Sequence, residues 1–107
     1  MFESIDFRPG EVAYDGFDRR ILEGFDEESD LLTDDMLLVK YPFNYAIDIG
    51  WHGGLKTFLL YVTQNSDWDD PVEKRICSDL NSLKINLMEC INNIRRLVDE
   101  EKILQDR

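Results

Sequence analysis

Residues 67–70, with the sequence Asp-Trp-Asp-Asp, form the short motif in this chain that is best suited to molecular recognition. An aromatic ring among carboxylates is typical of protein-binding hot spots, where the ring is a buried anchor and the charges steer a partner of opposite sign. The alternative is that Trp68 folds back onto the core as a loop anchor while the carboxylates stay solvated. A calcium site is disfavoured, because the motif lacks the glycine and the distant bidentate acid of a calcium loop.

The residues that most often perform catalysis or bind metals are few and are not clustered. His52 is the only histidine, and neither Cys77 nor Cys90 has a neighbour at the spacing of a zinc site. A cysteine paired with His52 could act as a nucleophile, but a polar residue beside glycines more often serves a turn. Scattered carboxylates perform acid–base catalysis only when a pocket holds two of them together. We therefore predict no catalytic residue, no cofactor and no metal site.

The charge of the chain restricts its partners. The 107 residues include 23 acidic and 12 basic side chains, which give a net charge of −11. Such a charge repels nucleic acids and anionic lipids and favours a basic protein as the partner. The alternative explanation is that the acidity only keeps the protein in solution. Residues 1–35 carry a net charge of −9 and residues 36–107 only −2, and this asymmetry is typical of an interaction segment.

The acidic segment and the loop around Trp68 together form the predicted partner-binding surface. The acidic segment supplies most of the charge that would steer a basic partner, and the loop supplies the aromatic anchor. The predicted partner-binding residues are Glu27, Glu28, Asp30, Asp34, Asp35, Asp67, Trp68, Asp69 and Asp70.

The acidic segment, residues 1–35, contains too many large apolar side chains for a disordered arm. Four of them recur with the spacing of one helical face, which predicts a short helix over about 15–25. Asp15 could cap the start of this helix, and Gly24 could end it. The four apolar residues are Phe17, Ile21, Leu22 and Phe25.

A β-hairpin is predicted where two strand-like runs, 45–52 and 55–63, flank the Gly-Gly pair at 53–54. The glycines would supply the positive φ angles of a two-residue turn, which places His52 opposite Leu55. In this register the apolar residues fall on one face, which identifies the core side. The predicted core pairs are Trp51/Lys56, Ile49/Phe58, Ile47/Leu60 and Tyr45/Val62, and the outer pairs are Gly50/Thr57, Asp48/Leu59 and Ala46/Tyr61.

Two features of this hairpin could carry function. Asp48 lies mid-strand on the outer face, where it is solvated, paired within the protein or in contact with a partner. Gly50, Gly53 and Gly54 do not form a phosphate-binding loop, because neither Lys-Ser/Thr nor a helix start follows them. We attribute all three glycines to the hairpin.

The C-terminal part of the chain predicts an amphipathic helix over about 79–103, because apolar residues recur there every three or four positions. Ser78 is the expected N-cap, and Asp79 would interact favourably with the helix dipole in the first turn. Strands are expected at 36–41 and 72–77. The apolar stripe of the helix consists of Leu80, Leu83, Leu87, Ile91, Ile94 and Val98.

These elements predict one α+β domain, residues 1–107, with a three- or four-stranded antiparallel sheet packed by a long C-terminal helix and a short N-terminal helical segment. Its parts are the acidic segment 1–35, the sheet 36–77 and the helix 78–104. The chain has no run of about 18 apolar residues and no basic and apolar regions of a signal peptide at its start. We therefore expect a cytoplasmic protein whose two thiols are buried and reduced.

Residues 36–98 resemble the small immunity proteins that bacteria keep against their own secreted toxins, including those of contact-dependent growth inhibition. The features that carry the resemblance are Tyr-Ala-Ile-Asp-Ile-Gly-Trp at 45–51, the short hairpin, Asp-Trp-Asp-Asp-Pro at 67–71, a last strand and the long helix. The resemblance implies a non-catalytic protein that blocks the active site of a cognate toxin domain, expected here to be a basic nuclease. Two alternatives stay open, namely an acidic adaptor or regulatory module, and an enzyme whose site the sequence does not reveal.

Overall fold

The computed structural model of the protein describes residues 4–105. Residues 1–3 and 106–107 of the expected domain lie outside the described residues, and with them Glu3, one of the carboxylates counted in the acidic segment. The helices are α1 (Arg19–Glu23), the short 3-10 helix η1 (Pro42–Asn44) and α2 (Leu80–Gln105). The strands are β1 (Glu11–Asp15), β2 (Leu37–Lys40), β3 (Tyr45–His52), β4 (Thr57–Gln64) and β5 (Glu73–Cys77).

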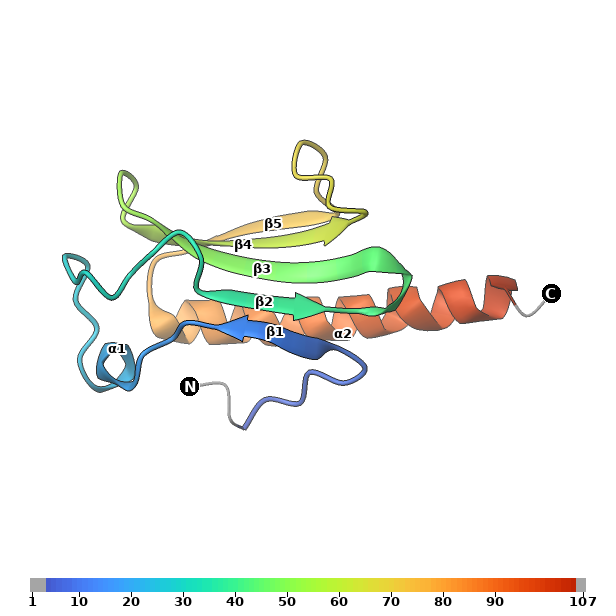
Figure 1. The fold of residues 1–107 in the computed structure, drawn as a ribbon, viewed down its shortest axis with the longest axis horizontal. Coiled ribbons are helices and arrows are strands. Elements are labelled where there is room, and N and C mark those ends of the chain that lie inside the picture. The colour runs from blue at the N-terminus through green and yellow to red at the C-terminus, as the bar shows by residue number, and fades with distance from the viewer. Residues whose placement is uncertain (1–3, 106–107) are drawn as a thin grey trace.

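The strands form one antiparallel sheet in the order β1-β2-β3-β4-β5, so each strand pairs with its neighbours in the sequence. Helix α2 lies along one face of this sheet (Figure 1). The predicted α+β class, an antiparallel sheet under a long C-terminal helix, is therefore confirmed. The sheet has a fifth strand because β1, in the acidic segment, pairs with β2. All residues of β1 are exposed, so its sequence lacks the alternation that would predict a strand.

The hydrophobic core fills the interface between α2 and the sheet. Every residue of this interface named here is at most 2% exposed, which confirms the predicted apolar stripe of the helix. The helix contributes Leu83, Leu87, Cys90, Ile91, Ile94 and Val98, and the middle strands contribute Ile47, Ile49, Phe58, Leu60 and Val62. No helix among the described residues is both long and apolar enough to cross a membrane.

The start of α2 differs by one residue from the prediction. The carboxylate of Asp79 accepts a hydrogen bond from the backbone N–H of Ser82 at 2.7 Å, so Asp79 and not Ser78 is the cap. Aspartate caps a helix as well as serine does, and the two adjacent candidates could not be separated by residue type alone. The helix then continues to Gln105, two residues beyond the expected end at 103.

The predicted turn of the hairpin is wrong, although its two faces are right. His52 pairs with Thr57 and not with Leu55, so the loop between the strands is longer than the expected Gly-Gly pair. The positive φ angle of this loop belongs to Lys56, at 53°, and to no glycine. Because the register differs from the predicted one by two residues, each side chain stays on its expected face. The core pairs are Trp51/Phe58, Ile49/Leu60 and Ile47/Val62, and the outer pairs are Gly50/Leu59, Asp48/Tyr61 and Ala46/Thr63.

The helix of the acidic segment, α1, is shorter than the predicted range 15–25. Its cap is Asp18, whose carboxylate accepts from the backbone N–H of Arg20 at 2.8 Å, and not the expected Asp15. The carboxylate of Asp15 accepts instead from the backbone N–H of Phe17 at 3.0 Å, in the turn between β1 and α1. The expected end at Gly24 is confirmed, since its backbone N–H bonds the carbonyl of Arg20.

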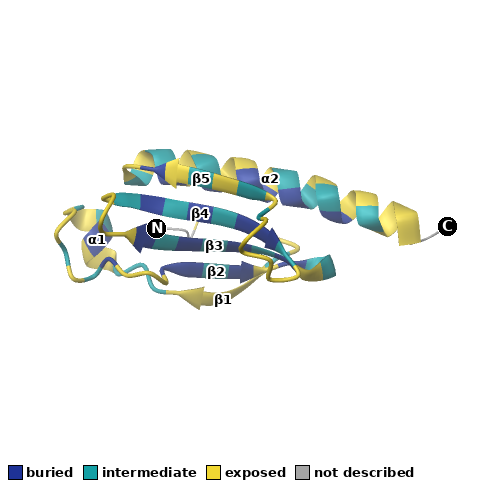
Figure 2. Ribbon diagram, turned by 90° about the horizontal axis from the view of Figure 1, so that it is seen from above, coloured by how far each residue is buried: buried dark blue, intermediate teal, exposed yellow. Residues whose placement is uncertain are grey.

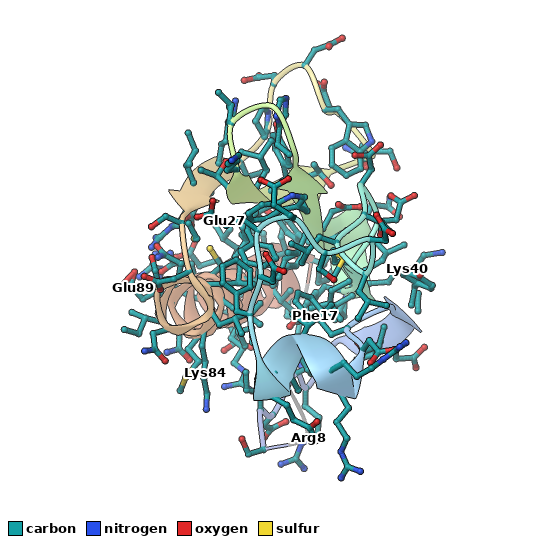
Figure 3. All side chains as sticks on the ribbon, turned by 90° about the vertical axis from the view of Figure 1, so that its left-hand side faces the viewer. Arg8, Phe17, Glu27, Lys40, Lys84 and Glu89 are labelled. Carbon is teal, nitrogen blue, oxygen red and sulfur yellow. The ribbon has the colours of Figure 1, made fainter. Side chains whose placement is uncertain are left out.

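An aromatic cluster attaches the acidic segment to the core. Phe25 lies 5.8 Å from Trp51 and 5.7 Å from Phe58 between ring centroids, and Phe17 lies 6.1 Å from Phe58. Figure 3, which looks along α2, shows Phe17 between α1 and the sheet. Ile21 of α1 is 2% exposed. The apolar residues of this segment therefore pack against the core, as their number indicated.

The polar side of β5 is tied to α2 by one guanidinium group. Arg75 donates hydrogen bonds to Glu73 at 2.9 Å and to Asn86 at 2.9 Å, and it also pairs with Glu89. Arg75 is 26% exposed at the side chain, and these partners satisfy its charge at the margin of the core.

Cys77 and Cys90 are both free and buried, as predicted. Burial raises the pKa of both thiols, that of Cys90 to about 12. Because the thiolate is the reactive form, both cysteines are poor nucleophiles and serve as small core residues.

The helix-on-sheet core makes Leu87 the most direct test of the fold. Leu87→Ala should lower the free energy of unfolding by about 2–5 kcal/mol, because it leaves a cavity at a side chain that is 0% exposed. Ile85→Ala, on the outer side of the same helix at 61% exposure, is the matched control and should change stability by less than about 0.5 kcal/mol. Chemical denaturation measures both, and equal effects of the two substitutions would contradict the assigned helix face.

Candidate functional site

The sheet face turned away from α2 has no second layer. Figure 2 looks down onto this side, where no helix crosses the strands. The loop between β4 and β5 rises above the sheet on this side (Figure 1). We call this side the open face, and by strand register and alternation it consists of Tyr14, Leu38, Lys40, Ala46, Asp48, Gly50, Leu59, Tyr61, Thr63, Lys74 and Ile76.

Three adjoining hollows on the open face meet at Asp48. The first, of about 570 Å³, extends between Lys40 and Trp68. The second, of about 480 Å³, extends towards Tyr14, and the third, of about 300 Å³, extends towards Trp51. Asp48 lines all three, so its carboxyl is the common centre of the concave part of the face.

Asp48 occupies an unusual position for an acid. It lies on the middle strand, with Leu38 directly opposite on one side and Tyr61 on the other. Within the described residues its side chain makes no hydrogen bond and no ion pair. Burial, assisted by the negative charge of Asp35, raises the pKa of Asp48 to about 6. Asp48 is therefore a partly desolvated, uncompensated carboxyl, and not the paired residue that the sequence left open.

Trp68 lies on the open face and is not part of the core. Its ring packs edge-on against Tyr61, with centroids 5.6 Å apart and an interplanar angle of 77°. Trp68 is nevertheless 47% exposed. The ammonium group of Lys74, which is opposite Tyr61 on strand β5, lies 5.6 Å from the centroid of the Tyr61 ring. The indole thus folds back, as one alternative expected, but onto the outside of the sheet, where half of it stays available for contact.

Asp34 and Asp35 are the predicted acidic residues that the structure brings to Trp68. Both line the third hollow together with Asp48 and Trp68, and Asp35 also lines the second hollow. Against these acids, the described residues that line the three hollows include one lysine, Lys40, and one histidine, His52. The concave centre of the open face is therefore predominantly acidic.

The other predicted site residues lie apart from the hollows. Glu27, Glu28 and Asp30 belong to the loop between α1 and β2, and Glu28 pairs with Lys56 of the hairpin loop at 2.9 Å. The exposed carboxylate of Asp67 accepts from the backbone N–H of Asp70 at 3.2 Å, which gives Asp67 a role in the turn. Asp69 and Asp70 are exposed in the same loop as Trp68.

Gly50 holds the acidic loop against the sheet. A Cβ atom at Gly50 would lie 2.1 Å from the carbonyl oxygen of Asp34, so only glycine allows the two backbones to approach so closely. Next to it, the backbone N–H of Trp51 donates to the carbonyl of Thr33 at 2.8 Å. Gly50 lies in strand β3 of the hairpin, as expected, and its lack of a side chain also positions Asp34 and Asp35.

Sequence reasoning missed several residues of this face. The outer position of Asp48 and Tyr61 followed from strand alternation, but nothing in the sequence placed Tyr14 beside them, because β1 was not predicted. An isolated glycine inside a strand pattern was the available signal for the close approach at Gly50.

His52, the histidine considered for nucleophilic catalysis, has a partner within its own loop. The Nδ1 atom of His52 accepts a hydrogen bond from the backbone N–H of Leu55 at 3.3 Å, within the hairpin loop. In the part of the chain that the structure describes, no three His, Cys, Asp or Glu side chains come together as a metal site would require.

Comparisons with known proteins identify no relative. No protein-family model matches the chain, and neither the curated proteins nor the solved structures contain a match. The open face is therefore interpreted from its own residues.

The raised pKa of Asp48 predicts how stability depends on pH. Its pKa is higher in the folded protein, about 6, than the ordinary value near 3.8, so folding favours the protonated form. The stability that this proton provides is present below about pH 4 and is lost as the pH rises through about 6. At pH 7.5, Asp48→Asn should raise the free energy of unfolding by about 1–2 kcal/mol, a range that allows for screening by water. Below about pH 4 the substitution should not change the free energy of unfolding, because Asp48 is then protonated and carries no charge.

Denaturation across pH 4 to 8 measures this effect. Asp69→Asn, at an exposed loop position, is the control for the general relief of negative charge and should change stability by less than about 0.5 kcal/mol. A loss of stability in Asp48→Asn at pH 7.5 would contradict the description of Asp48 as uncompensated.

Proposed function

We propose that this protein is a cytoplasmic immunity protein that binds a cognate secreted toxin, a basic nuclease, and blocks its active site. The observation that carries the proposal is the uncovered sheet face on which a half-exposed Trp68 lies beside Asp34, Asp35 and Asp48. The particular role, immunity against a toxin, rests on the resemblance of residues 36–98 to bacterial immunity proteins.

The open face has the composition of a binding surface. Large aromatic side chains that are partly exposed and already packed on one side lose little entropy when a partner covers them. Trp68 is such a side chain, because Tyr61 supports its ring from below. Exposed apolar groups extend the surface to both edges of the sheet, with Tyr14 at 50% and Ile76 at 60% exposure. A partner would therefore bury a continuous surface around a central acidic hollow.

The charge of the face supports a basic partner. Asp34, Asp35 and Asp48 line the hollows against the single ammonium of Lys40. A nuclease binds phosphates in a basic groove, and carboxylates presented on a concave face compete with phosphates for the same cations. The net charge of −11 would accelerate association and make it sensitive to salt. The proposed mechanism is thus competitive, with charge setting the association rate and aromatic contact setting the lifetime of the complex.

An enzyme is the second candidate, and one observation favours it. A carboxyl with a pKa of about 6, beside a second carboxyl in a hollow, is also an arrangement that acid–base catalysts use. The three hollows lie open on the face of a sheet, which suits a protein surface better than an enclosed substrate.

The proposal is tested with the product of the adjacent upstream gene, which under this proposal carries the toxic nuclease domain. The inhibition of its nuclease activity and the rates of association and dissociation should be measured for the wild type and variants, at low and at physiological salt. Trp68→Ala should raise the dissociation rate by about 10- to 100-fold, because a buried aromatic anchor is lost. The double variant Asp34→Asn, Asp35→Asn should lower the association rate several-fold and flatten its dependence on salt.

Matched controls separate contact from general effects. Glu27→Gln, Glu28→Gln removes the same charge away from the hollows and should slow association less. Ile85→Ala, on the outer side of α2, should leave inhibition unchanged. Unfolding of the free protein by Trp68→Ala would show that the indole is a structural anchor. Equal protection by all variants at every salt concentration would overturn the open face as the interface, and tight binding without inhibition would favour an adaptor.

A further inference from the structure

We propose that Asp48 receives one arginine side chain of the partner, whose guanidinium group enters the third hollow, which Asp48 lines together with Tyr61 and Trp68. This inference rests on the proposed function, because it names the chemistry by which the open face recognises a basic partner.

The strand register places Asp48 in the middle of a row across the sheet. Tyr14 pairs with Leu38, Leu38 with Asp48, Asp48 with Tyr61, and Tyr61 with Lys74. The carboxyl therefore has an aliphatic group on one side and an aromatic ring on the other. A carboxylate in such surroundings is only partly hydrated, which strengthens any interaction with a cation that reaches it.

The cations of this protein near the open face do not compensate Asp48. The ammonium of Lys74 lies over the Tyr61 ring, and that of Lys56 pairs with Glu28. Lys40 lines the first hollow together with Asp48 but forms no ion pair with it. The carboxyl is thus open to a cation from outside, and Asp34 and Asp35 add negative charge to the approach.

The walls of the hollow favour a guanidinium over an ammonium group. A guanidinium is planar, is weakly hydrated, stacks on aromatic rings and forms two parallel hydrogen bonds with one carboxylate. Tyr61 and Trp68, whose rings meet edge-on 5.6 Å apart, provide aromatic surface beside the carboxyl. An ammonium group is a compact, strongly hydrated charge that can neither stack on the rings nor form two parallel hydrogen bonds, so it should bind here more weakly than a guanidinium. A neutral side chain would leave the carboxylate desolvated and unpaired, so Asp48 would also reject partners that lack the cation.

The test uses a probe in place of the partner. The isotope-labelled protein is titrated with the blocked peptide Gly-Arg-Gly and followed by NMR at the backbone amides of Leu38 and Tyr61 and at the indole of Trp68. The matched control peptide is Gly-citrulline-Gly, in which a neutral urea replaces the guanidinium at nearly the same shape. We expect saturable shifts with the arginine peptide at millimolar concentration and none of comparable size with the citrulline peptide.

Variants assign the binding to Asp48. Asp48→Asn should weaken binding of the arginine peptide about tenfold, which corresponds to about 1.4 kcal/mol, while Asp99→Asn, at an exposed position of α2, should change its affinity by less than about twofold. Asp48→Asn should fold, since it removes an uncompensated charge. Equal affinity for the arginine and citrulline peptides, or for wild type and Asp48→Asn, would overturn the proposal. Equal affinity for Gly-Lys-Gly would overturn the choice of guanidinium.

The two proposals can fail separately. A protein that binds the arginine peptide at Asp48 but leaves the neighbouring toxin active would retain this inference and lose the immunity function. A toxin that is inhibited equally by the wild type and by Asp48→Asn would retain the immunity function and overturn this inference.

Discussion

The structure depends on one constraint, which is that the antiparallel sheet has a long amphipathic helix on only one of its two faces. Helix α2 covers one face, and the side chains between them, such as Leu87 and Phe58, are excluded from water. No second layer covers the other face (Figure 2). That face must therefore combine enough apolar surface to keep its strands ordered with enough charge to remain in water. The face accordingly carries the apolar side chains Tyr61 and Leu59 on β4 next to the charged side chains Asp48 on β3 and Lys74 on β5.

The acidic segment has two structural roles, because it completes the hydrophobic core and places two acids on the open face. The end of the core near the hairpin is not closed by α2, and Phe17 and Phe25 close it by packing on Phe58. The chain then passes along β3, where Gly50 admits the carbonyl of Asp34. In this way the same segment that completes the core also delivers Asp34 and Asp35 to the open face. Two acids of this segment thus lie beside the partly buried carboxyl of Asp48 and the exposed indole of Trp68.

The elements that burial determines could be predicted from the sequence. The stripe of α2 and the two faces of the hairpin follow from periodicities of 3.6 and 2, because each has one side in the core. The exact pairing within the hairpin did not follow, because a shift of two residues preserves both faces and leaves the burial pattern unchanged. Strand β1 was missed for the opposite reason, since all of its side chains are exposed. Edge pairing depends on backbone hydrogen bonds, which do not depend on residue type.

The candidate site was predictable only in part. Residue types indicated Trp68 and the acidic loop, but their relation to Asp48 depends on how the loop between β4 and β5 folds back over the sheet. Glu27 and Glu28 carry the same charge as Asp34 and Asp35 but lie elsewhere, so the charge pattern of the sequence could not separate the two pairs. What distinguishes the two groups is the close backbone approach at Gly50, a tertiary contact.

The central claim, that the open face is the partner-binding surface, is tested most directly by fluorine NMR of the protein labelled with 5-fluorotryptophan. The chain has two tryptophans, of which Trp51 is 6% and Trp68 47% exposed, so each reports on one side of the sheet. On addition of the proposed cognate toxin domain, unlabelled, the Trp68 resonance should move and lose its response to exchange of H₂O for D₂O, while the Trp51 resonance stays unchanged. A saturated complex in which Trp68 keeps its resonance and its response to solvent would contradict the account.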